Sequence, residues 1–177
     1  AGDAALAGVG VCAPVVTMIT AIGALIGFGG GPLMSTRMGR RDMDGARQII
    51  TNSFYLLLAL SVLATVPLLI FKRQILFTFG CSELLWDYAQ AYFTTYVSGT
   101  VFALLSYGLN QITMSQGFSG TAMRSVMLGA AVNIALDPVF IFALHMGVRG
   151  AALATVLSQA CSTAYILRFL MSDRAAV

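Results

Sequence analysis

The stretch AALAGVGVCAPVVTMITAIGALIGFGGGPLMST, residues 4–36, contains no charged side chain. A membrane-spanning helix needs about 20 consecutive, mostly apolar residues, so this stretch is long enough to cross a bilayer. Gly8, Gly10 and Pro14 predict a short extramembrane helix or turn at its start, and the span itself is expected over residues 14–35. This long run therefore predicts a membrane protein built from helices.

The composition of the whole chain agrees with that prediction. Hydrophobic residues make up 58% of the 177 residues and charged residues only 10%, whereas soluble domains carry about 25% charged residues. The net charge of +3 and the pI of about 9.0 come from basic residues at the ends of apolar runs, a pattern typical of contacts with phospholipid headgroups. We therefore expect membrane lipids as partners and no nucleic acid.

Four further apolar runs follow the first. They predict spans at residues 49–71, 85–114, 122–144 and 150–170. Ser82 precedes the third span and is expected to cap its first turn. Because the connections are short, successive spans are expected to be antiparallel neighbours. The predicted fold is all-α: a polytopic transmembrane helical bundle of about five spans within residues 1–177.

The distribution of basic residues predicts how the bundle is oriented. With five antiparallel spans, the first connection, the third connection and the end of the last span lie on one side of the membrane. The arginines there are Arg37, Arg40, Arg41, Arg47, Arg124, Arg168 and Arg174. The opposite side carries Lys72, Arg73 and Arg149. Arg124 is expected in the connection before the fourth span. Cytoplasmic loops are enriched in lysine and arginine, so we expect the arginine-rich loop, residues 37–47, to face the cytoplasm of a multi-pass plasma-membrane protein.

The run NIALDPVFIF, residues 133–142, places a carboxylate and a proline inside an otherwise apolar span. Asn133 and Asp137 are four residues apart and so lie on one face of a helix. Pro138 has no backbone N–H, which disturbs the carbonyl of Ile134 one turn back. Oxygens clustered in this way suit a proton or a small hard cation such as sodium, and a carboxylate in low dielectric takes up a proton near neutral pH. Asp137 and Asn133 are therefore candidate cation ligands.

Alternatives to this interpretation stay open. Asp137 lies eight residues before His145, so the carboxylate could instead lie near the helix end and pair with water. In the next span, Thr155 belongs to the small-residue stretch GVRGAALATVLSQ, where its hydroxyl could reach the neighbouring helix or where the whole face could serve packing alone.

Three amides lie in the predicted third span and just beyond it: Asn110, Gln111 and Gln116. They could line a path through the bundle or form hydrogen bonds between helices. The glycine-rich run GALIGFGGGP, residues 23–32, resembles a phosphate loop only superficially, because no lysine follows it. Its glycines at four-residue spacing are typical of close helix packing, and residues 29–32 are expected to loosen the end of the first span.

Most enzyme templates are excluded by what the chain contains. His145 is the one histidine. Cys12, Cys81 and Cys161 are far apart and match no metal or disulfide spacing. We therefore expect no enzyme, no cofactor, and no metal beyond a sodium ion at Asp137.

Several of these stretches resemble the multidrug and toxic compound extrusion (MATE) transporters, with some likeness to the MepA-like branch. GDAALAGVGVCAPV resembles the family's segment between its first and second spans. GFGGGPLMSTRMGRRDMDGARQIITNSF resembles the end of the second span, the basic loop and the start of the third. The most specific signal is the pattern N-x-x-x-D-P-x-F-I-F followed by G-V-x-G-A-A-L-A-T, within a stretch that resembles the fourth to sixth spans.

The resemblance implies twelve spans in two six-helix lobes that rock between inward-open and outward-open forms. This chain would supply spans two to six, most of the amino-terminal lobe, with the first helix and the whole second lobe absent. In relatives, a cation site in this lobe uses an aspartate on the first span together with asparagine, aspartate and threonine on the fifth and sixth. The last three match Asn133, Asp137 and Thr155, while the first-span aspartate has no counterpart here.

The resemblance leads to one main hypothesis for the parent protein, a sodium- or proton-coupled multidrug efflux transporter. Its partners would be small amphipathic, cationic drugs and the second lobe of the same polypeptide. The alternatives are a flippase for lipid-linked precursors of the same superfamily and a non-transporting membrane scaffold fragment. The sequence leaves open the choice between sodium and proton, the identity of the drug and its binding residues, and the oligomeric state.

Overall fold

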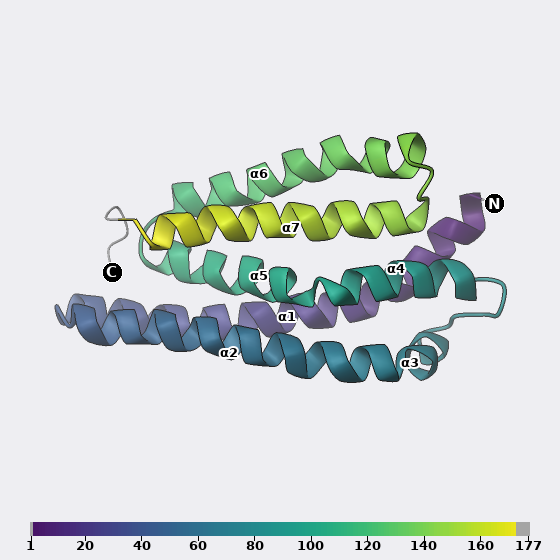
Figure 1. Cartoon of the computed structure of the whole chain (residues 1–177). Coiled ribbons are helices and arrows are strands. Elements are labelled where there is room, and N and C mark those ends of the chain that lie inside the picture. The colour runs from purple at the N-terminus through teal and green to yellow at the C-terminus, as the bar shows by residue number, and fades with distance from the viewer. Residues whose placement is uncertain (1, 173–177) are drawn as a thin grey trace.

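The computed structural model describes residues 2–172, and all its regular elements are helical. They are α1 (Gly2–Gly39), α2 (Met43–Ile70), α3 (Lys72–Thr78), α4 (Trp86–Ser98), α5 (Thr100–Ser115), α6 (Ser119–Pro138), the π-helix η1 (Val139–Ala143) and α7 (Val148–Leu170). The long helices run roughly along one common direction, and α4 and α5 follow each other as one broken rod (Figure 1). The predicted all-α bundle is confirmed. Arg174 lies outside the described residues.

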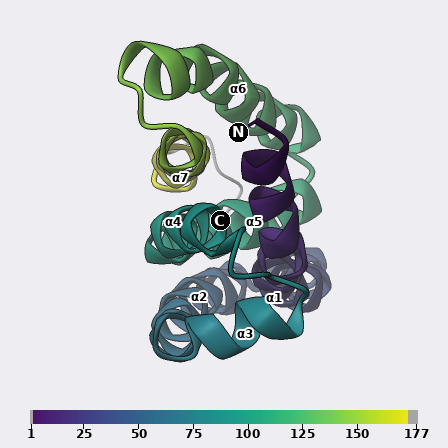
Figure 2. The same ribbon diagram turned by 90° about the vertical axis from the view of Figure 1, so that its right-hand side faces the viewer.

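The rods are stacked across the bundle. Viewed from the end, α1 and α2 lie at one side, the α4–α5 rod and α7 follow, and α6 forms the opposite side (Figure 2). α1 packs most extensively on α5, and α6 on α7. Within residues 2–172, four segments are long and apolar enough to cross a membrane: α1, α2, α6 together with η1, and α7. Most of the large hydrophobic side chains on their outer faces are exposed, as expected for helices that face lipid.

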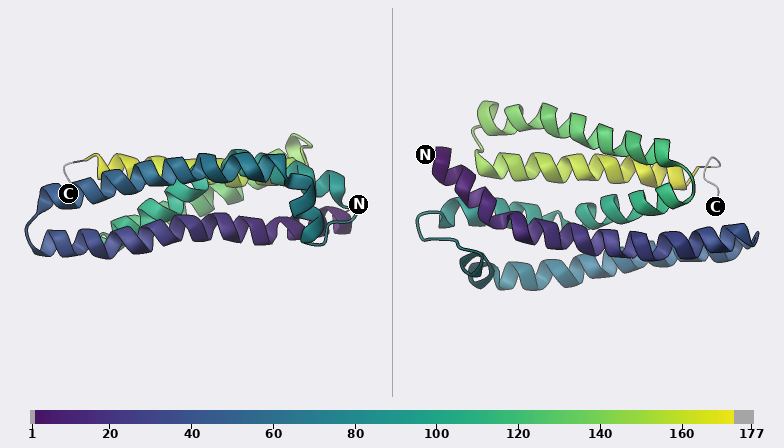
Figure 3. Two further views of the ribbon diagram at one scale, coloured as in Figure 1. Left: turned by 90° about the horizontal axis from the view of Figure 1, so that it is seen from below. Right: turned by 180° about the vertical axis from the view of Figure 1, so that it is seen from behind.

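α1 is a single continuous helix of 38 residues. Of the two structures predicted around Gly8, Gly10 and Pro14, a short helix or a turn, the turn is therefore wrong. Residues 29–32, expected to loosen its end, are helical as well. Its N-terminal part is inclined to the rest (Figure 3). Glycine and proline remain helical here because a backbone in lipid has no water to bond in place of its own carbonyls.

The buried face of α1 allows α5 to approach very closely. A Cβ atom added to Gly23 would lie 3.0 Å from the carbonyl oxygen of Leu104, and one added to Gly27 would lie 2.8 Å from that of Gly108. Helices in lipid associate mainly through such packing, since burial from water does not drive them together. The close packing predicted from the glycine spacing is confirmed.

The third predicted span, residues 85–114, consists of two helices rather than one. α4 ends at Ser98 and α5 begins at Thr100, with Gly99 between them. A side chain at residue 99 would collide with Val156 of α7, so only glycine fits, and glycine weakens a helix interior. The packing against α7 therefore explains a break that the apolar pattern alone does not reveal.

Other boundaries also differ from the sequence-based expectation. Residues 72–78, expected as a connection, form the short helix α3, and Arg124 lies inside α6. Ser82 does not cap α4: its backbone carbonyl accepts a hydrogen bond from the Leu85 N–H at 3.0 Å, and no side chain bonds the first turn. That turn holds Ser82 three residues before Leu85, the residue in the N-cap position of α4.

Basic side chains gather at one end of the bundle. The loop between α1 and α2, the start of α6 and the end of α7 share that end (Figures 1 and 3). Arg124 and Arg168 therefore lie at the same end as residues 37–47, as the sequence predicts, while Lys72 and Arg73 lie at the other.

The arginine-rich loop is closed by Asp42 at the start of α2. Its carboxylate accepts a hydrogen bond from the Gly45 N–H at 2.9 Å and one from Arg37 at 2.7 Å. These two bonds, the Gly45 N–H first, hold the pKa of Asp42 below its ordinary value of 3.8. Because the folded-state pKa is the lower one, the stabilisation is present at neutral pH and is lost as pH falls through the lowered value.

We expect Asp42→Ala to loosen the first turn of α2, because the Gly45 N–H then loses its acceptor. Hydrogen–deuterium exchange at residues 43–46 should become faster, and the wild-type protein should show the same change at acidic pH. Asp44→Ala, in the same exposed turn, is the matched control and should leave the exchange rate unchanged. Equal exchange in the two variants would contradict the capping role.

Candidate functional site

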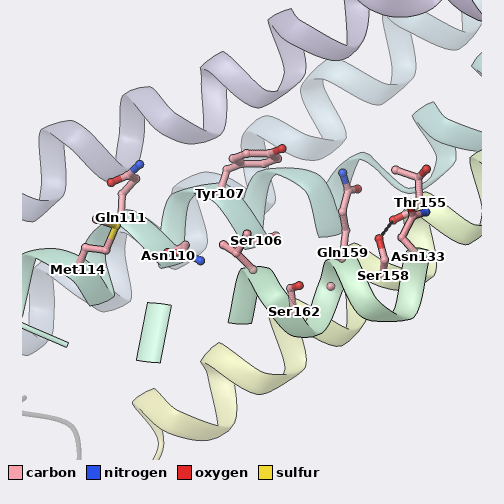
Figure 4. Close-up of a pocket in the computed structure, with 13 residues that line it drawn as sticks. Ser106, Tyr107, Asn110, Gln111, Met114, Asn133, Thr155, Ser158, Gln159 and Ser162 are labelled. Carbon is pink, nitrogen blue, oxygen red and sulfur yellow. Dashed lines mark hydrogen bonds between the residues drawn. The ribbon is translucent and has the colours of Figure 1, made fainter. Parts of the chain in front are cut away.

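A cavity of about 420 Å³ lies between α5, α6 and α7 (Figure 4). It is lined by Ser106, Tyr107, Asn110, Gln111, Met114, Val126, Gly129, Ala130, Asn133, Thr155, Ser158, Gln159 and Ser162. Most of these residues carry a hydroxyl or an amide group, and none of them is charged. Such a set is unusual inside an apolar bundle and marks the cavity as the candidate site.

The α6 wall of this region contains the two predicted ligands of that helix. Asn133 lines the cavity, and Asp137 follows one turn later along the helix. The Nδ2 atom of Asn133 and the Oδ1 atom of Asp137 are both buried without a hydrogen-bond partner among the described residues. A buried carboxylate oxygen with no donor is costly unless something positive binds it.

α6 continues through Pro138 and then changes to the π-helix η1, in which the Leu144 N–H donates to the Val139 carbonyl at 2.9 Å. Because Pro138 has no N–H, the Ile134 carbonyl lacks its usual helical donor. π-helical turns of this kind are frequent at functional sites. Asp137 therefore lies at the point where the regular helix ends and not at a frayed terminus.

Thr155 lies across the cavity on α7, but its hydroxyl does not donate to another helix. It donates to the Ala151 carbonyl of its own helix at 3.0 Å. The oxygen keeps lone pairs for another group. The small residues around it pack as expected: Ala152 and Ala154 are fully buried, and Gly150 lies against the backbone of Phe140.

Two tyrosines of α4 belong to the same region and were not predicted. The Tyr92 hydroxyl has both Thr155 and Asp137 among the groups around it. The rings of Tyr92 and Tyr96 are stacked, with centroids 6.0 Å apart. The amide of Gln159 donates to the Tyr96 hydroxyl at 3.3 Å. No spacing in the sequence indicates that α4 lies beside α6 and α7. The only sequence feature that could have pointed to these two tyrosines is their polar hydroxyl within an apolar run.

The sequence leaves two roles open for the amides at residues 110, 111 and 116: lining a path through the bundle or bonding between helices. Asn110 lines the cavity and also donates to the Ala122 carbonyl of α6 at 3.2 Å. Gln111 lines the cavity as well. Gln116 is buried elsewhere, with both amide atoms lacking a partner among the described residues.

The sequence of this chain matches a known protein family. The family model described as MatE matches residues 1–139, which is most of the chain. The chain belongs to the MatE family. This family consists of transporters, which agrees with the expectation that the chain is not an enzyme, and with its apolar helices the MatE chain is a membrane-embedded protein.

Curated relatives of this MatE chain include multidrug export proteins named MepA. The one from Staphylococcus haemolyticus is 30% identical over 154 residues, which cover 87% of this chain and 34% of the relative. The one from Staphylococcus aureus strain NCTC 8325 is 26% identical over 160 residues, 90% of this chain and 36% of the relative. The chain thus spans about a third of the length of these relatives.

Solved structures of MATE transporters have the same fold. An inward-facing multidrug resistance transporter of the family superposes with a TM-score of 0.92 at 32% identity, over 97% of this chain and 39% of that one. An outward-facing structure gives a TM-score of 0.89 at 32% identity, over 96% of this chain and 38% of that one. Both forms contain these helices in nearly the same arrangement.

Proposed function

We propose that this chain forms most of one lobe of a cation-coupled multidrug efflux transporter that exports amphipathic, cationic compounds by alternating access. The proposed cation ligands are Asp137, Asn133 and Thr155, and the coupling ion is sodium or a proton. The second lobe is proposed to belong to the same polypeptide, in the plasma membrane, with residues 37–47 facing the cytoplasm.

The observation that carries the proposal is the unpartnered Oδ1 atom of Asp137, buried one helical turn from an unpartnered amide at Asn133. A proton or sodium ion would supply the positive charge that this carboxylate lacks. An asparagine side chain can turn its carbonyl oxygen toward such an ion, and the Thr155 oxygen has lone pairs to spare because its hydrogen is already donated.

Two further observations support coupling to drug export. The cavity beside these residues has a volume of about 420 Å³, and neither lysine nor arginine is among its lining residues, which suits a cation better than a pyrophosphate-bearing lipid precursor. The high TM-scores to both inward-facing and outward-facing transporters support movement of this lobe as one body, with the conformational change located between lobes.

The proposal is tested with the complete transporter that carries this chain, reconstituted in liposomes that contain a fluorescent amphipathic cation. An imposed sodium or proton gradient of opposite direction is expected to drive the dye against its own gradient. Imposing each gradient alone identifies the coupling ion. Dye movement that is the same with and without both gradients would overturn the proposal.

A further inference from the structure

The α7 wall of the cavity offers acceptors and few donors. The Ser158 hydroxyl donates to the Thr155 carbonyl at 2.7 Å, and the Ser162 hydroxyl donates to the Ser125 carbonyl of α6 at 2.9 Å. The Thr155 hydroxyl donates to Ala151 at 3.0 Å. Each hydroxyl has one hydrogen, so all three present only lone pairs to a molecule in the cavity.

Gln159 extends this acceptor surface by one helical turn beyond Thr155. Its Nε2 atom is engaged with the Tyr96 hydroxyl at 3.3 Å. Its Oε1 atom is buried and has no partner among the described residues, although the side chain lines the cavity. A buried carbonyl oxygen without a donor costs free energy that a ligand with an N–H group would recover.

We propose that Gln159 determines specificity in this cavity by accepting a hydrogen bond from the N–H group of a protonated amine. The cavity would thus prefer secondary and tertiary ammonium compounds to quaternary ones with the same carbon skeleton. This inference deepens the proposed function and rests on it, because it names the chemical class of the exported cation.

The two classes of cation differ at this point of contact alone. Both carry one positive charge. A quaternary ammonium has no N–H, so it leaves the Gln159 oxygen buried and unpaired. Sites built to hydrogen-bond a ligand discriminate strongly against an analogue that lacks the donor.

The test compares a naphthylethyl dimethylamine with the quaternary analogue in which a third methyl group replaces the N–H. Binding to the purified complete transporter is measured by calorimetry at neutral pH, where the amine is protonated. The tertiary amine is expected to bind about tenfold more tightly, the lower end of what a hydrogen bond to a charged group contributes. In Gln159→Met the ratio of the two affinities should fall to about one.

Two control variants distinguish a loss of specificity from a loss of folding. Gln159→Glu retains an acceptor oxygen and should preserve the preference for the tertiary amine. Gln48→Met replaces an exposed glutamine of α2 that does not line the cavity, and it should leave the ratio at its wild-type value. Equal affinities in the wild-type protein, or a ratio that survives in Gln159→Met, would overturn the inference and leave the proposed function intact. Failure of both compounds to bind would count against both.

Discussion

Asp137→Asn will abolish gradient-driven drug export by the complete transporter while the amount of protein in the membrane stays the same. Asparagine has nearly the same shape as aspartate but cannot hold a proton or neutralise a sodium ion. The Oδ1 atom of Asp137 is buried and unpartnered, and no acidic residue lines the neighbouring cavity within the described part of the chain. We expect efflux to fall by at least about tenfold, which corresponds to about 1.4 kcal/mol in the coupled step.

The substitution also separates a functional role of Asp137 from a structural one. A buried carboxylate without a partner destabilises the fold that contains it, so its removal should leave the thermal stability of the transporter unchanged or raise it. A structural carboxylate would show the opposite, with lower stability and less protein in the membrane.

The measurement combines resistance of cells to an amphipathic cation, membrane levels of the protein and a thermal unfolding curve. Asp87→Asn is the matched control, because Asp87 lies exposed in the first turn of α4. It should retain full resistance. Wild-type resistance in Asp137→Asn, with normal protein levels, would show that export does not depend on this carboxylate.

Much of the fold could be predicted from apolar runs and charge alone. The span expected at residues 150–170 matches α7, and the one at 49–71 matches all but the first turns of α2. In lipid, the backbone must satisfy its own hydrogen bonds, so a long charge-free run has few choices besides a helix. The same physics explains why no turn forms near Pro14, since turn-forming residues lose much of their effect without water.

Features that depend on contacts between helices could not be predicted in the same way. The break at Gly99 arises from Val156, which is far along the chain. No periodicity within one helix contains that information.

In the candidate site, too, residues on one helix could be predicted together and residues on different helices could not. Asn133 and Asp137 could be paired from sequence because they are one turn apart on a single helix. Tyr92 and Gln159 could not, since each meets its neighbours only through tertiary packing. Local spacing therefore identifies the carboxylate and its nearest amide, whereas the rest of the site requires the fold.

The tight contact between α1 and α5 leads to the second large expected effect: Gly27→Leu will prevent the bundle from forming. A Cβ atom at residue 27 would already lie 2.6 Å from the Cβ of Gln111 and 2.8 Å from the Gly108 carbonyl oxygen. Backbone atoms cannot move aside as a flexible side chain can, so the two helices would have to separate. Gln111, which lines the cavity, would be displaced with α5.

Gly29 provides the matched control on the same helix. A Cβ atom there meets nothing within 4 Å, so Gly29→Leu adds only an exposed apolar side chain and should fold normally. Alanine substitutions at the same two positions test the same contact with a smaller side chain. Gly27→Ala is expected to destabilise the protein by about 1–3 kcal/mol through overpacking, whereas Gly29→Ala should stabilise it slightly, because alanine favours a helix by about 1 kcal/mol over glycine.

Unfolding in a denaturing detergent, followed by circular dichroism, measures all four variants on one scale. Opposite signs for the two alanine variants are the decisive result, because helix propensity alone would shift both in the same direction. If Gly27→Ala proved as stable as Gly29→Ala, the close approach of α1 to α5 would not be what holds these helices together. Other contacts would then have to hold α5 in place as a wall of the cavity.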